Sequence, residues 1–259
     1  GMQEMQNVTK NVQQSLEGTK SSWERTAAAF ESTVKSIERL NGVVQSMASA
    51  YSNAELNATR LEVIMRQRMK STDAEIASIK KLTSAQADLG IISAGVQRTG
   101  AQQLATFLYQ KSSLEVLIPA MNNLVAQQRG FSAEAGDAVN VANLMGKAMM
   151  GMTSALRRVG ITFTEAQEAA IKNGNEQERA AMLAQIITDN VGEMNAALAK
   201  TDAGKQKQLA NSMGALKAKI GSLVSGSIKS YVTISRCSSR RILTSLKKSR
   251  TTFPISSGR

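Results

Sequence analysis

Between Met2 and Thr83 the chain contains no proline, and from Trp23 to Met65 every seventh residue is apolar. The recurrence runs through Trp23, Phe30, Ile37, Val44, Tyr51, Ala58 and Met65. An α-helix brings residues seven apart onto one face, whereas a β-strand spreads them over both of its faces. The spacing therefore predicts long helical structure with one apolar stripe.

A second apolar stripe accompanies the first, and its offset changes along the chain. It comprises Ala27 and Val34, four residues after members of the first stripe, then Leu40, Met47, Ala54 and Leu61, three residues after them. Two stripes at three-four spacing are typical of a coiled-coil seam. Because the offset changes near Asn41-Gly42, we expect a bend or a loop there. A single rod and an antiparallel hairpin packed on the rest of the chain both fit the pattern.

The first stripe is the candidate functional surface of this region. Six of its residues form the candidate oligomer seam: Trp23, Phe30, Ile37, Val44, Tyr51 and Met65. In the first interpretation they bind other copies of the chain. In the second they are ordinary core residues that pack against the chain's own helices.

Composition extends the helical prediction to the whole chain. Only 3% of the residues are aromatic and only two are proline, while the abundant residues are mostly good helix formers. Glycines and capping residues then divide the chain beyond Thr83 into short helices, with Gly130, Gly160 and Gly174 as stops. Expected helix starts are Thr72 with Glu75, Ser132 with Glu134, Thr164 with Gln167, and Asn175 with Glu178.

We therefore predict an all-α protein with four parts. These are a coiled-coil-like region over 1–83, a compact domain of short helices over 84–200, an amphipathic helix over 201–224 and a basic tail over 225–259. The amphipathic helix has Leu209, Met213, Leu216, Ile220 and Val224 on one side. The predicted core of the compact domain comprises Leu104, Phe107, Leu108, Leu114, Leu117, Ile118, Leu124, Val139, Val141, Leu144, Met145, Leu156, Val159, Ile161, Phe163, Ile171, Met182, Leu183, Ile186, Ile187 and Val191.

The net charge of +12 comes mainly from the tail. Residues 225–259 carry eight basic residues and no acidic one, which leaves +4 for the rest of the chain. The tail contains neither alanine nor glutamine, so we interpret it either as a disordered basic segment or as a stretch read in a shifted frame. Its charge predicts only non-specific nucleic-acid binding.

Several kinds of chemistry lack the residues that they need. Histidine is absent and Cys237 is the single cysteine, which excludes Ser-His and Cys-His nucleophile pairs, His/Cys zinc cages and an internal disulfide framework. Gly146-Lys147 lacks the spacing of a phosphate-binding loop. Glu165 and Glu168 are better explained as first-turn charges than as a catalytic pair. We expect no catalytic, cofactor or metal site, no cofactor and no enzymatic activity.

The sequence contains no apolar run of the length that a membrane-spanning helix needs, and no signal region. We therefore expect no membrane segment. Gly1 resembles a tag-removal scar. The methionines Met145, Met149, Met150 and Met152 are open to two interpretations, a partner-binding groove or core filling.

An ordered series of segments between Thr99 and Gly221 resembles the tape measure protein of long-tailed phages and related prophages. The matching segments are Thr99–Leu104, Ser113–Leu124, Gly146–Gly151, Ser154–Ile161, Asn190–Asn195, Thr201–Gly204 and Leu216–Gly221. The last of them has the closing pattern Leu-Lys-x-x-Ile-Gly. None of the motifs is catalytic, so the order of the segments carries the resemblance.

The resemblance implies a virion structural protein. Its copies would associate as extended helices, tail tube and tail assembly proteins would bind around them, and helix length would set tube length. The protein would lie in the host cytoplasm during assembly and then in the virion tail, with no small-molecule substrate. The family usually continues for hundreds of residues, so the chain is expected to be a fragment.

Two other functions fit parts of the sequence. A coiled-coil interaction module of a signalling or secretion system would share the heptad pattern of the first 80 residues, without explaining the ordered segments after Thr99. A small nucleic-acid-binding protein would rest on the basic tail alone.

Overall fold

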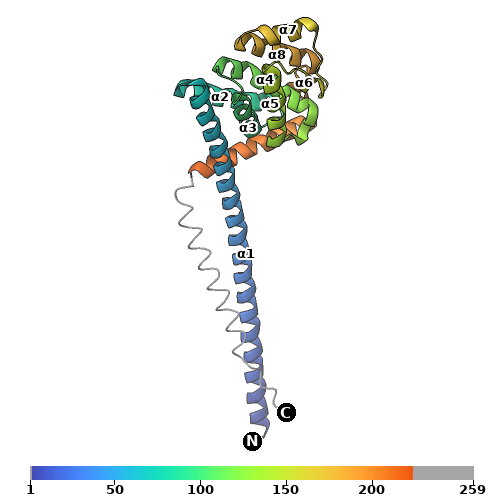
Figure 1. Cartoon of the computed structure of the whole chain (residues 1–259). Helices are drawn as coiled ribbons and strands as arrows, with labels where there is room; N and C mark the ends of the chain where they lie inside the picture. The colour runs from blue at the N-terminus through green and yellow to red at the C-terminus, as the bar shows by residue number, and fades with distance from the viewer. Residues whose placement is uncertain (1, 224–259) are drawn as a thin grey trace. The chain divides into compact units, whose positions relative to one another are not determined.

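The computed structural model describes residues 2–223, without the side chains of several positions between 2 and 27 (Figure 1). All regular structure in this part of the chain is helical, which confirms the all-α prediction. The elements are α1 (Met2–Met69), α2 (Asp73–Leu89), α3 (Ala94–Ala105), α4 (Lys111–Arg129), η1 (Gly130–Ser132), α5 (Ala135–Met149), α6 (Ser154–Arg157), α7 (Glu165–Asn173), α8 (Glu176–Val191) and α9 (Met194–Ala199). One more helix covers residues 202–223. The basic tail, Cys237 and Val224 lie outside the described residues.

Helix α1 continues without interruption through Asn41-Gly42. The loop expected at that point is therefore wrong, and so is a hairpin turning there. A glycine inside a helix costs only about 1 kcal/mol relative to alanine, which the neighbouring turns offset. At about 1.5 Å per residue, a helix of 68 residues is about 100 Å long.

The chain divides into two compact units. Of the described residues, one unit comprises 49–220, called here the helical domain, and the other includes 2–48 and 221–223. The helical domain includes the last turns of α1, and the sequence-based boundary at residue 84 falls inside α2.

Capping boxes start three helices of the helical domain where the sequence places them. Thr72 Oγ1 accepts a hydrogen bond from the backbone N–H of Glu75, and the Glu75 carboxylate accepts one from the backbone of Thr72. Thr164 and Asn175 make the same paired contacts with residues three positions on.

The predicted start at Ser132 is wrong by two residues. Helix α5 has Glu134 as its N-cap, and Asp137 Oδ2 accepts a hydrogen bond from the backbone N–H of Glu134 at 3.0 Å. Ser132 lies in the short 3₁₀ turn η1, where its hydroxyl donates to the carbonyl of Arg129. Asp137 also holds Arg129, so one carboxylate organises the whole turn.

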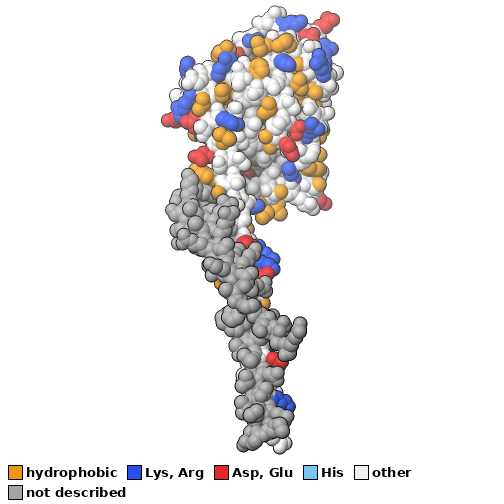
Figure 2. Space-filling view, turned by 60° about the horizontal axis from the view of Figure 1, so that its bottom comes forward, with side chains coloured by type: hydrophobic (Ala, Val, Ile, Leu, Met, Phe, Trp, Pro, Cys, Tyr) orange, Lys and Arg blue, Asp and Glu red, His pale blue; other side chains and the backbone are white. Residues whose placement is uncertain are grey.

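Helix α4 is central to the domain and contacts α3, α5, α8 and α9. Most of the predicted core residues are buried in this arrangement. The predicted core residues Phe107, Val139, Leu144, Val159, Phe163, Met182 and Val191 are only half-buried. Helix α3 approaches α5 closely, because a Cβ at Gly100 would lie only 2.9 Å from the Cβ of Ala138. On the face shown in Figure 2, hydrophobic side chains are interspersed with charged ones.

A buried asparagine joins three parts of the domain that lie far apart in sequence. Asn195 Oδ1 accepts hydrogen bonds from the backbone N–H groups of Ile91 and Ile92 at 2.9 and 3.2 Å. The backbone N–H of Asn195 donates to Oδ1 of Asn123 in α4 at 3.1 Å. Gly90 is needed beside it, because a Cβ there would lie 2.0 Å from the Asn195 side chain. Unmade hydrogen bonds of buried groups are costly, so this contact specifies one packing of the three segments.

Introducing a charge into the core tests these assignments. Leu117 and Ile186 are fully buried, so Leu117→Asp and Ile186→Asp each bury an unpaired carboxylate and should lower the free energy of unfolding by more than about 4 kcal/mol. Thermal unfolding followed by circular dichroism measures this. Val116→Asp is the matched control, because its side chain is 44% exposed, and it should change little. Unchanged unfolding of both core variants would contradict the assigned core.

Candidate interaction surfaces

The apolar stripe of α1 is exposed along part of its length. Phe30 and Ile37 are 42% and 46% exposed, and Leu40 and Val43, which flank the stripe, are at least half exposed. The side chain of Trp23 lies outside the described ones. Large apolar side chains that recur on one helix face and remain in water mark an interaction surface, whereas scattered ones do not. This part of α1 is therefore a candidate docking face.

The stripe becomes core toward the end of α1. Val44 and Tyr51 are half-buried, and Met65, together with Leu61 of the second stripe, is fully buried in the core of the helical domain. For Met65 the assignment to an oligomer seam is wrong, because its side chain is enclosed by the chain's own helices. A heptad pattern alone does not distinguish the two environments, since each requires an apolar face.

Ion pairs fix the last turns of α1 to α2. The Glu62 carboxylate accepts hydrogen bonds from Arg66 at 2.9 Å and from Lys80 of α2 at 3.0 Å. These donors hold the pKa of Glu62 below its usual value, with Arg66 contributing most. Arg66 also pairs with Asp73, and Asp73 and Glu62 together raise the pKa of its guanidinium. The Glu62 contribution to stability is present above the unfolded pKa and is lost as the pH falls through the lower folded pKa.

The helix over residues 202–223 presents a second apolar face. Leu209, Met213 and Leu216 are each more than half exposed, and they lie on one side as the sequence predicts. A different face holds the helix on the domain, where Gln208 and Asn211 donate to the backbone carbonyls of Asp88 and Ile91 at 3.0 and 2.9 Å. An amphipathic helix normally buries its apolar side. Here polar side chains make the attachment and the apolar side faces water.

Close backbone packing strengthens the attachment of this helix. Gly204 is buried, and a Cβ at this position would lie 2.0 Å from the carbonyl oxygen of Leu198. The helix therefore approaches α9 at a distance that only glycine permits. This close contact sets the position at which the exposed face of residues 205–220 begins. The sequence predicts the amphipathic pattern of the helix, but not that its apolar side is exposed.

The carboxylates Glu165 and Glu168 lie in the first turn of α7 as expected. Glu168 accepts hydrogen bonds from Arg157 at 2.7 Å and from the hydroxyl of Thr153 at 2.7 Å. Both donors lower the pKa of Glu168, Arg157 more than Thr153. The carboxylate therefore links α7 to the α6 segment.

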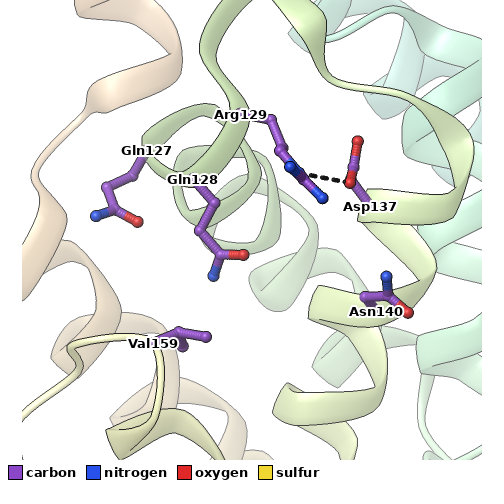
Figure 3. A pocket seen from close by; sticks show the side chains of 6 residues that line it. All are labelled: Gln127, Gln128, Arg129, Asp137, Asn140 and Val159. Atoms are coloured by element: carbon purple, nitrogen blue, oxygen red, sulfur yellow. Dashed lines mark hydrogen bonds and ion pairs between the residues drawn. The ribbon is translucent and has the colours of Figure 1, made fainter.

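One open hollow of about 410 Å³ lies between the end of α4, the first turns of α5 and the segment after α6 (Figure 3). Its lining comprises Gln127, Gln128, Arg129, Asp137, Asn140 and Val159. The two charged members neutralise each other in an ion pair of 2.7 Å. The hollow offers amide hydrogen-bonding groups to a polar ligand. Its two charged side chains, Arg129 and Asp137, already pair with each other in the turn between α4 and α5.

The methionine cluster divides between the two interpretations. Met145 and Met149 are buried in the core, while Met150 and Met152 are 63% and 49% exposed at the turn after α5. Two of the four methionines therefore fill the core, and the other two make a small exposed patch at the turn.

Searches against protein-family models, curated proteins and solved structures return no match for this chain. Within residues 2–223, no three His, Cys, Asp or Glu side chains lie close enough together to hold a metal ion. In the same part of the chain, every helix is too short or too polar to cross a bilayer.

Removing the exposed part of the stripe tests its role. The double change Phe30→Ser and Ile37→Ser should weaken self-association of the whole chain roughly a hundredfold, because two large side chains lose their burial at the interface. Analytical ultracentrifugation gives the association constant.

Leu61→Ser is the contrasting variant for this test. It should lower the midpoint of thermal unfolding, because Leu61 is fully buried, whereas the double variant should leave that midpoint unchanged. If the double variant associates as strongly as the parent chain, the stripe is not an interface.

Proposed function

We propose that this chain is a structural protein of a phage tail, a tape measure fragment that acts as a helical scaffold for tail tube assembly and length. The observation that carries the proposal is α1, one uninterrupted helix from Met2 to Met69 with Phe30 and Ile37 exposed on one face. The ordered segments between Thr99 and Gly221 that resemble the tape measure family add a second line of support.

The physical basis of a helical scaffold is the constant rise of the α-helix. Each residue adds about 1.5 Å, so the number of residues in a helix sets a distance that another assembly can copy. Burial of an exposed apolar stripe favours association between copies of the chain, and exposed charges keep the other faces hydrated. This role needs no bound cofactor, no metal and no substrate, and we assign the chain no enzymatic activity.

The proposed partners are other copies of the chain and the tail tube and tail assembly proteins. The proposed location is the host cytoplasm during assembly and then the virion tail. The same stripe also fits a second candidate, a coiled-coil module of a signalling or secretion system that binds one partner. The two candidates differ in one respect, since only a scaffold makes the size of an assembly depend on the length of α1.

Changing the length of α1 by whole heptads tests the proposal. Duplicating residues 24–37 in the phage or prophage that encodes the chain should lengthen its tails by about 21 Å, and deleting them should shorten the tails equally. Electron microscopy of purified particles measures the difference as a shift in the mean of many tails.

A matched insertion provides the control for that experiment. Fourteen added residues after Phe131, in the turn between α4 and α5, should leave tail length unchanged because they do not extend α1. If tail length does not follow the heptad changes, or if no tails depend on the chain, the scaffold proposal is wrong and the interaction module is favoured.

A further inference from the structure

The exposed face of residues 202–223 has the spacing of a coiled-coil seam. Its apolar residues follow one another at intervals of four, three, four and three: Leu209, Met213, Leu216, Ile220 and Leu223. In heptad notation Leu209, Leu216 and Leu223 occupy position d, and Met213 and Ile220 occupy position a. Leu223 is 79% exposed. Four of the five seam residues are therefore exposed and Ile220 is half-buried, so the seam can accept another helix of the same type.

The charges beside this seam are positive. Lys205 and Lys219 occupy position g and Lys217 occupies position e, while the only acidic residue between 202 and 223 is Asp202. Lys205 pairs with Asp202 at 3.1 Å in an exposed contact of the kind that contributes little. Two copies of this helix paired with each other would set no carboxylate against these lysines at the e and g positions. The seam therefore selects a helix with acidic residues beside its own seam.

Helix α1 carries such residues at regular spacing. Glu17, Glu24, Glu31 and Glu38 recur at every seventh position, and the last three each follow directly after a stripe residue. With Phe30 and Ile37 at position d and Val34 at position a, these glutamates occupy position e. Glu24, Glu31 and Glu38 are exposed. The heptad therefore presents an acidic column along the edge of the apolar stripe.

We propose that residues 23–38 of α1 in one copy bind the exposed face of residues 202–223 in a second copy as a parallel two-stranded coiled coil. In a parallel pair, position g of one helix faces position e of the next heptad on its partner. Lys205 and Lys219 are fourteen residues apart, and so are Glu24 and Glu38. One register therefore satisfies both pairs, Lys205 with Glu24 and Lys219 with Glu38.

The same register aligns the apolar residues without a mismatch. It places Phe30 opposite Leu216, Val34 opposite Ile220 and Ile37 opposite Leu223. Shifting one helix by a heptad in one direction sets Gln45 instead of a glutamate against Lys219. Shifting it in the other direction keeps two charge pairs, with Glu17 and Glu31, but places Lys20 at position a opposite Met213. An antiparallel pair brings e against e and g against g, which leaves both Lys205 and Lys219 away from the glutamate column. Only Lys217, at position e, would meet that column in an antiparallel pair, so the charges favour the parallel orientation, and the charges together with the apolar positions favour this register.

The contact is heterologous, because it joins two different surfaces of the same chain. Each copy that uses its α1 segment still offers its 202–223 face to the next copy, so the contact generates rings or open chains of molecules. This inference rests on the self-association in the proposed function and names the surface that the exposed stripe binds. Its failure would leave the length test of the scaffold role unaffected.

Charge exchange on the whole chain tests the proposal. The acidic-column variant, Glu24→Lys with Glu38→Lys, and the lysine variant, Lys205→Glu with Lys219→Glu, should each weaken association roughly tenfold at low salt. An equimolar mixture of the two should recover the parent association, because each α1 segment then meets an oppositely charged partner. Lys207→Glu changes charge off the seam, at position b, and should have no effect. Sedimentation velocity with circular dichroism as a folding check measures all four.

Each other outcome identifies a different arrangement and overturns the proposal. If both variants associate like the parent chain, the stripe pairs with its own counterpart or with nothing, and charge complementarity plays no part. If the chain carrying all four changes behaves like the parent but the mixture of the two variants does not, the two helices pair within one molecule.

Disulfide trapping tests the register independently. In a Cys237→Ser background, an Ile37→Cys chain mixed with a Leu223→Cys chain should give a crosslinked dimer on mild oxidation, because the two positions face each other at d. Ile37→Cys with Leu209→Cys should not. Efficient crosslinking of the second pair instead of the first would show a parallel contact shifted by two heptads and overturn the proposed register.

Discussion

Burial of Leu61 and Met65 anchors α1 in the helical domain, and the exposure of its stripe depends on where that burial ends. The ion pairs of Glu62 and Arg66 with Lys80 and Asp73 hold the same turns against α2. Before these turns the heptad repeat continues with the same spacing, yet Phe30 and Ile37 are exposed. One apolar pattern therefore serves as core in one part of a helix and as a docking face in another.

The sequence predicts those features of the fold that depend on neighbouring residues. The capping boxes at Thr72, Thr164 and Asn175 involve contacts three residues apart, so their residue types are sufficient to place the helix starts. The predicted start at Ser132 is wrong because Ser132 and Glu134 are only two residues apart, whereas Glu134 and Asp137 have the three-residue spacing of a capping box. The all-α class follows from propensity summed over long segments.

Features that join distant segments have no such local signal. Asn195 contacts Ile91 more than a hundred residues away, and nothing around either residue predicts the pairing. Likewise, the spacing of Leu209, Met213 and Leu216 predicts an apolar side but not its environment. That side is exposed because Gln208 and Asn211 attach the helix through another face, and those contacts are made to Asp88 and Ile91, far away in the chain. For the same reason, the sequence did not separate Met65 from the other stripe residues.

Two exposed seams on one chain make self-association the central claim of this account. Size-exclusion chromatography with light scattering on the whole chain, over a wide range of protein concentration, tests it most directly. The account predicts multimers that grow with concentration and elute earlier than compact particles of the same mass. A monomer at every concentration would contradict it, since both apolar faces would then remain in water without a partner of their own kind.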